Sequence, residues 1–159
     1  MSIIIRQATF DDIDNIKPMW IKLVEFHSDK QFIFKSSPDF RDKVVDDIKL
    51  FMGKPNVAFF VVEQDKKLVG FSSATISQRP SVFAIKSKGY IGDTYVDEEL
   101  RGQGIGTNLI STTIDWLKKQ GAQFVDLQVM SSNETGRKFW EKSGFQTVNY
   151  YMVKNLTNE

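Results

Sequence analysis

Three glycines at alternate positions lie between a strand-like segment and a helix-like segment, and they constrain this chain more than any other feature. The stretch spans residues 101–107, after the strand-like run Tyr90–Val96 and before the helix-like run Thr107–Gln120. Glycine lets the backbone approach a ligand closely, and the first N–H groups of a helix have no partner within it. Those groups, with the positive end of the helix dipole, bind phosphate. Arg101 and Gln103 add one charged and one neutral donor, so we expect a phosphate-bearing cofactor at this turn.

Two well-known glycine-rich phosphate loops fit the stretch poorly. A P-loop needs a Lys-Ser/Thr pair after its last glycine, whereas Thr107-Asn108 follows here. A dinucleotide-binding loop has the spacing G-x-G-x-x-G near the first strand, whereas Gly102, Gly104 and Gly106 alternate two-thirds of the way along the chain. Glycines that only turn the chain and cap a helix remain an alternative.

Length and composition exclude several classes of protein. The 159 residues are expected to form one domain over residues 1–159, and a net charge of +1 with interspersed acids and bases argues against electrostatic binding of nucleic acid. Cysteine is absent, which excludes disulfides, thiolate metal sites and a cysteine nucleophile, and His27 is the single histidine. No metal site is therefore expected. The apolar run Ile3–Ile5 is too short to cross a membrane, so we expect a cytoplasmic protein with no membrane partner.

The spacing of apolar residues predicts ten elements in the order β-α-α-β-β-β-α-β-α-β. The six predicted strands are Ile3–Arg6, Ala58–Glu63, Leu68–Ile76, Tyr90–Val96, Val125–Val129 and Thr147–Lys154. The four predicted helices run from a Thr9 cap to about His27, from Ser37-Pro38 to Gly53, from Thr107 to Gln120 and from Glu134 to Ser143.

The connections predict how these elements assemble. The polar turn Gln64–Lys67 joins two strands as an antiparallel hairpin, and Gln78–Lys88 is expected to be a loop. Pro18 should kink or split the first helix. The strands before and after the glycine-capped helix should be parallel and joined by a right-handed crossover. We therefore predict an α/β fold with a mixed, mostly antiparallel central sheet flanked by helices.

Two motifs resemble those of the GNAT superfamily of acetyl-coenzyme A-dependent N-acetyltransferases. The family's loop, Arg/Gln-x-x-Gly-x-Gly/Ala, is matched by Arg101, Gly104 and Gly106, and the preceding strand ends similarly in Tyr95-Val96-Asp97-Glu98. The family's second motif, Asn-x-x-Ala-x-x-x-Tyr-Glu-Lys-x-Gly-Phe, is similar to residues 133–145. The motifs lie about 30 residues apart in matching element contexts, and the resemblance covers Ile3–Lys154.

The resemblance implies that acetyl-coenzyme A is the cofactor and that its acetyl group passes to a primary amine by direct attack in a ternary complex. It also implies that the strand ending at Val96 splays from the strand near Val125–Met130, so that the pantetheine arm pairs between them. The Val96 backbone would bond this arm, and the Thr94 N–H would stabilise the oxyanion. The implied cofactor contacts are Thr94, Tyr95, Val96, Arg101, Gly102, Gln103, Gly104, Ile105, Gly106, Thr107, Asn133, Arg137 and Trp140.

The chain departs from the second motif at two positions. Gly136 replaces the usual alanine, which weakens the helix slightly. Trp140 replaces the usual tyrosine, which many members are thought to use as a general acid, and an indole N–H does not give up its proton near neutral pH. Trp140 either lines the cofactor slot or packs in the core, and Tyr150, Tyr151 or water are alternative proton donors. We assign no general acid.

A base is needed because an alkyl ammonium must lose a proton before it attacks. Asp93, next to Thr94, is the candidate, although it could instead point to the other side of the strand and pair with a lysine. Glu25 and His27, at the end of the first helix, lie where family members often build the acceptor pocket; His27 is also an alternative base.

The acceptor itself is left open. A polyamine or other small amine, an amino acid, an aminoglycoside and a protein N-terminus all fit, and the partner prediction also includes a homodimer. The alternatives to an enzyme are an acetyl-coenzyme A sensor and a nucleotide-binding protein that uses the same glycine loop.

Overall fold

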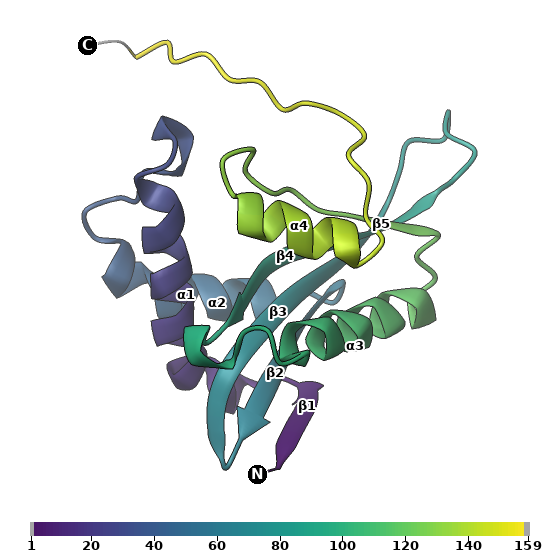
Figure 1. Cartoon of the computed structure of the whole chain (residues 1–159). Coiled ribbons are helices and arrows are strands. Elements are labelled where there is room, and N and C mark those ends of the chain that lie inside the picture. Colours follow the sequence, from purple (N-terminus) through teal and green to yellow (C-terminus); the bar gives the residue numbers. More distant parts are fainter. Residues whose placement is uncertain (1, 158–159) are drawn as a thin grey trace.

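Five strands form one mixed sheet with helices on both faces (Figure 1). The computed structural model describes residues 2–157. The strand order is β1-β2-β3-β4-β5; neighbours from β1 to β4 are antiparallel, and β4 and β5 are parallel. The strands are β1 (Ile3–Gln7), β2 (Val57–Gln64), β3 (Lys67–Gln78), β4 (Ser87–Val96) and β5 (Phe124–Asp126). The predicted mixed, mostly antiparallel α/β fold is confirmed.

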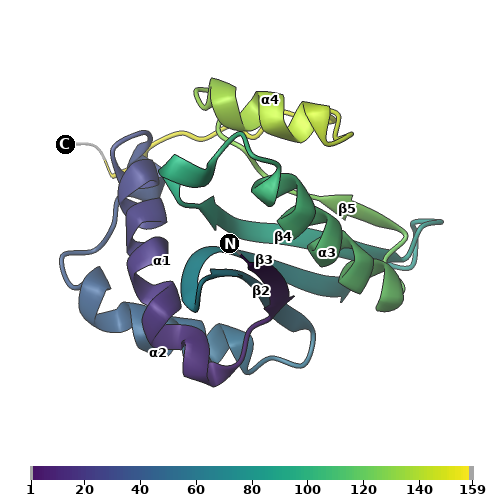
Figure 2. The same cartoon turned by 60° about the horizontal axis from the view of Figure 1, so that its bottom comes forward.

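Four helices cover the sheet, two on each face, as Figure 2 shows for α1 and α2 against α3 and α4. They are α1 (Ile13–Ser28), α2 (Phe40–Met52), α3 (Ile105–Lys119) and α4 (Glu134–Lys142), accompanied by the 3-10 turns Phe10–Asp12, Phe32–Phe34 and Glu98–Leu100. Among the described residues, no helix combines the length and apolar character needed to span a bilayer.

The core follows from the two-residue period of β2. Phe59 and Val61 pack under α1 and α2, whereas Phe60 and Val62 pack on the α3 side. Because successive strand residues point to opposite faces, a strand with helices on both sides must be apolar at every position. Trp20 of α1 stacks on Phe59 at a centroid distance of 5.8 Å and thereby fixes α1 over the sheet.

Several predicted boundaries are wrong, and one predicted strand is absent. Residues 147–154 form no strand in the structure, and the strand predicted at 125–129 is confined to Phe124–Asp126. Both patterns alternate as strands do, but a strand also needs a hydrogen-bonded neighbour, and β5 has only β4. The loop predicted at 78–88 is present but shorter, since Gln78 pairs with Ser87 and residues 79–86 form the connection.

Two smaller corrections concern helices. Helix α1 is continuous through Pro18 and is not split there. Helix α2 begins at Phe40 with Asp39 as its N-cap, two residues after the predicted start, because the Ser37 hydroxyl bonds the Asp39 carboxylate at 2.8 Å instead of capping the helix.

The start of α1 is held to β1 by a buried carboxylate, and this makes a testable prediction. Asp12 accepts two 2.8 Å bonds from the Arg6 guanidinium and one 2.8 Å bond from the Thr9 N–H. Asp12→Asn should lower the free energy of unfolding by about 2 kcal/mol, since bonds to a charged group are each worth about 1.5–3 kcal/mol and Arg6 is partly solvated. Chemical denaturation measures this, with the exposed neighbour Asp11→Asn as control.

The pH dependence of the same variant has a defined sign. The Arg6 guanidinium holds the pKa of Asp12 below its ordinary value. A lowered pKa contributes stability that is present at neutral pH and is lost as the pH falls below about 4, the ordinary value, toward the lowered one. The difference between wild type and Asp12→Asn should therefore shrink in acid. An equal difference at pH 7 and at pH 3 would contradict this account.

Candidate functional site

The glycine loop has the backbone conformation that only glycine adopts easily. Gly102 and Gly104 have φ values of +78° and +81°, and a Cβ at either position would meet nothing within 4 Å. Glycine is therefore required here by the left-handed backbone and not by crowding within the protein. Gly104 is the N-cap of α3, and the Asn108 N–H makes a 3.0 Å bond to the Gly104 C=O. The N–H groups of residues 105–107 precede this bond and are open to a ligand at the helix end.

The two polar side chains of the loop donate to backbone carbonyls that precede it, one at the end of β4 and one in the 3-10 turn Glu98–Leu100. The Arg101 Nε donates to the Val96 C=O at 2.9 Å, and its guanidinium lies 5.7 Å from the centre of the Tyr95 ring. The Gln103 amide donates to the Glu99 C=O at 3.2 Å. The loop is thus braced before any ligand binds, and contact of either side chain with a cofactor remains a prediction.

Beside this loop, β4 loses its neighbour. The pairing of β4 with β5 covers only Lys88 to Tyr90, so the rest of β4 has no strand on that side. The Asp97 N–H donates to Val69 of β3, whereas the Val96 C=O faces away from β3 and accepts from Arg101. Since backbone groups alternate in direction along a strand, the N–H groups of Thr94 and Val96 face the open side. These are the groups assigned to the oxyanion and the pantetheine arm.

A bulge in β4 decides where Asp93 points. Ser72 pairs with Thr94 and Ala74 pairs with Ile91, so Gly92 and Asp93 together oppose Ser73. One extra residue reverses the alternation of faces, and bulges are enriched beside active sites for this reason. Tyr95 accordingly packs on the α1 face and Ile91 on the α3 face, although both have odd numbers.

The bulge leaves Asp93 half-buried on the side of α1. Burial raises the pKa of Asp93 above its ordinary value, and the nearby His27 opposes this rise. Among residues 2–157, no ion pair joins Asp93 to a lysine; Lys88, on the same strand, pairs with Asp126 at 3.0 Å. Within these residues, the structure therefore does not show the alternative in which Asp93 pairs with a lysine.

The two residues predicted to line the acceptor pocket, His27 and Glu25, have different surroundings at the end of α1. His27 is half-buried, with its ring 5.2 Å from Phe26 and 6.0 Å from Phe34, and it lies close enough to Asp93 to affect its pKa. Glu25 is exposed and forms an ion pair with Arg41 of α2. His27 therefore influences Asp93 electrostatically, while a role for either His27 or Glu25 in binding the acceptor remains a prediction.

Sequence reasoning missed a tyrosine near Asp93, Tyr90, and the carboxylate opposite that tyrosine, Asp126. Burial, together with the charges of Asp93 and Asp126, raises the pKa of the half-buried Tyr90 above its ordinary value. Asp126 of β5 lies directly opposite Tyr90 in the pairing, and its Oδ1 is buried without a hydrogen-bond partner. Lys88 and Tyr90 are two residues apart, which indicates that they share one face of the strand. The bulge that adds Asp93 to this face cannot be recognised from the sequence.

Gly136, one departure from the family motif, lies beside the N-cap of α4. Asn133 caps the helix, and its Oδ1 accepts from the Gly136 N–H at 2.9 Å. A Cβ at residue 136 would lie 2.5 Å from the Asn133 Nδ2, so alanine here would require the Asn133 side chain to shift. Asn133 is predicted to contact the cofactor, and it would have to do so while its Oδ1 accepts the hydrogen bond that caps α4. Arg137, one residue further, is exposed.

Trp140, the second departure from the family motif, packs against aromatic rings. Trp140 is half-buried and meets Phe139 and Phe145 edge to face, at centroid distances of 4.9 and 5.4 Å. A Cβ at Gly106 would be in contact with the Phe139 ring, so Phe139 packs α4 against the start of α3. The packing favours a structural role for Trp140.

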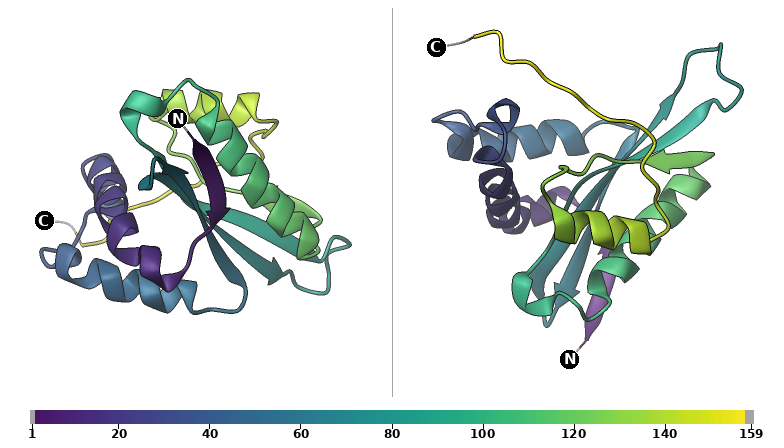
Figure 3. Two further views of the ribbon diagram at one scale, coloured as in Figure 1. Left: turned by 90° about the horizontal axis from the view of Figure 1, so that it is seen from below. Right: turned by 45° about the horizontal axis from the view of Figure 1, so that its top comes forward.

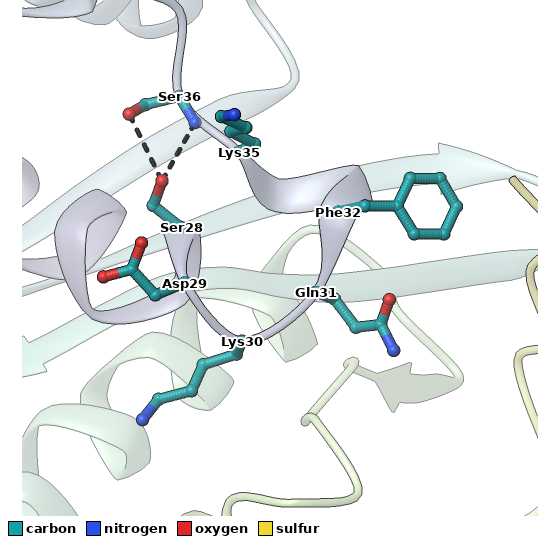
Figure 4. Close-up of a pocket in the computed structure, with 7 residues that line it drawn as sticks. All are labelled: Ser28, Asp29, Lys30, Gln31, Phe32, Lys35 and Ser36. Carbon is teal, nitrogen blue, oxygen red and sulfur yellow. Dashed lines mark hydrogen bonds between the residues drawn. The ribbon is translucent and has the colours of Figure 1, made fainter. Parts of the chain in front are cut away.

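Two hollows lie near the end of α1. One of about 260 Å³ lies between α1 and the start of α4 and includes the predicted residue Asn133. It is lined by Phe26, Lys30, Met130, Ser132, Asn133, Glu134 and Thr135. The other, of about 460 Å³, is formed by the loop after α1, where the Ser36 N–H donates to the Ser28 hydroxyl at 3.1 Å (Figure 4). It contains none of the predicted site residues.

Comparison with known proteins agrees with this architecture. Residues 20–145 match the model of the acetyltransferase (GNAT) family. The chain is 29% identical to an uncharacterized N-acetyltransferase of Methanocaldococcus jannaschii, over 89% of this chain and 60% of that protein. It is 32% identical to N-alpha-acetyltransferase 30 of Schizosaccharomyces pombe, over 57% of this chain and 58% of that protein. The chain thus matches about 60% of the length of these curated relatives.

Solved structures show the same fold at lower identity. A mutant of the BH1408 protein from Bacillus halodurans superposes with a TM-score of 0.85 at 23% identity, covering 96% of this chain and 99% of that one. The aminoglycoside N-acetyltransferase AAC(6')-Iy in complex with CoA superposes with a TM-score of 0.80 at 16% identity, covering 97% and 94% of the two chains. The glycine loop, the parted strands and the match over residues 20–145 lead to one conclusion: this chain belongs to the GNAT acetyltransferase family.

Proposed function

We propose that this chain transfers an acetyl group from acetyl-coenzyme A to a primary amine. The observation that carries the proposal is the parting of β4 from β5 directly beside the glycine-capped start of α3, with Asp93 aimed to the α1 side by the bulge. A phosphate site, an open strand edge and a carboxylate of raised pKa then follow one another along a single strand and its loop.

The residues present fit the proposed cofactor. The N–H groups of residues 105–107, at the positive end of α3, suit a pyrophosphate, and the left-handed Gly102 and Gly104 leave room for it. The open edge of β4 suits an amide chain, which can pair with Val96 as an added strand would. When bound, acetyl-coenzyme A supplies an acetyl group already activated as a thioester.

The remaining roles fall to groups of this chain. The Thr94 N–H faces the open edge and would donate to the thioester oxygen as negative charge develops there. Asp93 would accept the proton of the acceptor ammonium, directly or through water, and its raised pKa makes it a better base than an ordinary aspartate. His27 lies on the side from which the acceptor would approach. With no cysteine in the chain, the acetyl group passes to the amine without a cysteine-bound intermediate.

One observation favours a second candidate. Trp140 stands where the family usually has a tyrosine, and it packs against Phe139 and Phe145. An acetyl-coenzyme A sensor with little or no turnover would not need a proton donor at that position. The similar proteins named above include an aminoglycoside N-acetyltransferase and an N-alpha-acetyltransferase, so both small amines and protein N-termini belong in the test.

The test is a panel of amines assayed for thiol release from acetyl-coenzyme A. The panel contains a polyamine, an amino acid, an aminoglycoside and a peptide with a free N-terminus. Because the chain has no cysteine, a thiol reagent detects only the released coenzyme A. Turnover with at least one amine, and its acetylated product in the mass spectrum, supports the proposal. Cofactor binding by calorimetry with no turnover on any amine supports the sensor, and absence of cofactor binding contradicts both.

Trp140→Phe is expected to retain most of the turnover number. Phenylalanine keeps an aromatic edge against Phe139 and Phe145, and only the indole N–H is lost. If that N–H guided the departing sulfur, the turnover number would fall about tenfold, the worth of one hydrogen bond. Steady-state kinetics distinguish the two roles. Complete loss of turnover with unchanged cofactor affinity would contradict both.

A further inference from the structure

We propose that the connection between β3 and β4, residues 79–86 and called the hairpin tip below, binds the surface of a bilayer that contains anionic lipid. Its apolar side chains would enter the interface, and the cations behind them would face the lipid phosphates. This inference concerns a surface remote from the glycine loop and does not depend on the proposed catalytic activity. It revises the expectation of no membrane partner, which considered only segments that could cross a membrane.

The hairpin tip projects beyond the rest of the sheet, as Figure 1 and the right panel of Figure 3 show. Residues 82–85 within it read Val-Phe-Ala-Ile. Val82 is 84% exposed, Phe83 is 43% exposed and Ile85 is 44% exposed. Apolar side chains that adjoin one another on a projecting loop add little to the core, and contiguous exposed apolar groups mark interaction sites.

Contacts of its own hold the hairpin tip in shape. The Arg79 guanidinium donates to the Ile85 C=O at 3.0 Å and lies 3.9 Å from the centre of the Phe83 ring. The Lys86 N–H donates to the Gln123 side chain at 3.0 Å, which ties the tip to the segment that leads from α3 into β5. A preformed loop loses little conformational freedom on binding, so these contacts favour an interaction surface.

Cations gather directly behind the hairpin tip. Residues 78–88 and 116–124 contain no Asp or Glu, and they carry five cations: Arg79, Lys86, Lys88, Lys118 and Lys119. Because the whole chain has a net charge of +1, the remaining residues carry a net charge of −4. Lys88 pairs with Asp126, whereas Lys118 and Lys119, exposed in the last turn of α3, form no ion pair within residues 2–157. Positive charge is thus concentrated at this end of the protein.

An anionic bilayer fits the order of these groups. Apolar side chains lie at the projecting end and cations lie behind them, which matches the depth order of acyl chains and phosphates in a bilayer. A polyanion such as nucleic acid would be met by cations at the front, and it offers no apolar layer to Val82 and Ile85. The glycine loop precedes α3 and the lysines end it, so a bound bilayer would leave the loop accessible.

The experiment is cosedimentation of the full chain with vesicles of phosphatidylcholine and with vesicles that also contain phosphatidylserine. We expect binding only to the anionic vesicles, and weaker binding at high salt, because salt screens exposed charges. Val82→Ser/Ile85→Ser changes no charge and should weaken binding at least about tenfold, because apolar area no longer leaves water. Lys118→Gln/Lys119→Gln should weaken it about 30-fold, the expected effect of two cations near an anionic surface.

A matched control removes two exposed cations from the opposite end of β3. Lys66→Gln/Lys67→Gln lies at the turn between β2 and β3 and should bind vesicles as wild type does. Because the chain has no cysteine, Val82→Cys can carry a single fluorophore that is sensitive to polarity. Its emission should shift to the blue when anionic vesicles are added, whereas the same probe on Lys67→Cys should not respond.

Three results would overturn the proposal. Binding to neither kind of vesicle would mean that the hairpin tip has no bilayer partner. Full binding by Val82→Ser/Ile85→Ser would mean that charge alone acts, and equal affinity of that variant and wild type for an RNA oligonucleotide would identify a polyanion instead. A probe at residue 82 that stays in water while the protein cosediments would place the contact elsewhere. All substituted side chains are exposed, so a thermal melt should show each variant still folded.

Discussion

Asp93→Asn is expected to lower the turnover rate by about 10²–10⁴-fold, the usual contribution of a positioned general base. Asparagine keeps the shape of the side chain at the β4 bulge but cannot accept a proton. The affinity for acetyl-coenzyme A, measured by calorimetry, should be unchanged, because the residues assigned to the cofactor lie further along β4, in the glycine loop and at α4. The rate of the variant should rise with pH toward a limit set by free amine, whose pKa is roughly 10.

The control for this variant is Asp115→Asn, which removes one carboxylate from the exposed face of α3. It should keep the wild-type rate and pH profile. If Asp93→Asn also kept both, Asp93 would not be the base, and His27, Glu25 or a chain of waters would have to take the proton.

The same substitution should stabilise the fold, which separates a catalytic role from a structural one. Burial raises the pKa of Asp93, so the folded state binds a proton more tightly than the unfolded state does. Stability therefore falls as the pH rises from the ordinary carboxyl value of about 4 through the raised value, and the loss is complete above it. Asp93→Asn removes this cost at pH 7. A denaturation midpoint higher than that of wild type at pH 7, with the advantage lost in acid, is the expected result.

Gly104→Val is expected to weaken acetyl-coenzyme A binding by about 100-fold or more. The valine side chain would occupy the space in front of the α3 N-terminus, where a Cβ meets no protein atom within 4 Å. A pyrophosphate held away from this end loses bonds to N–H groups worth about 1.5–3 kcal/mol each, and two such bonds correspond to at least a 100-fold change. Calorimetry with coenzyme A measures the effect directly.

The strain of the substitution needs its own control. Gly104 has a φ of +81°, and a residue with a Cβ in this conformation costs about 1–2 kcal/mol. Gly121→Val imposes the same strain at φ +91°, beyond the far end of α3, where a Cβ also meets nothing within 4 Å. The two variants should lose similar stability, and only Gly104→Val should lose cofactor affinity. Equal affinity in the two folded variants would remove the glycine loop from the cofactor site.

The sequence by itself determined the features that depend on neighbouring residues. The two-residue period of Ala58–Glu63, the polar turn before Leu68 and the glycines before α3 are local patterns, and each predicted element of this kind is present. Asp65 and Lys66 adopt positive φ at that turn, as a tight hairpin requires. The element order and the two motifs were then enough to predict the mixed sheet and the family.

The tertiary structure alone decided the features that depend on pairing between distant segments. The bulge opposite Ser73 sets which face Asp93 occupies, and it arises from the register of β3 with β4, which no local pattern records. The pairing of β4 with β5 places Asp126 opposite Tyr90, whose pKa is also raised by the charge of Asp93. Residues 147–154 alternate as a strand does and yet form none within the single chain, because a strand exists only where another strand supplies its hydrogen bonds.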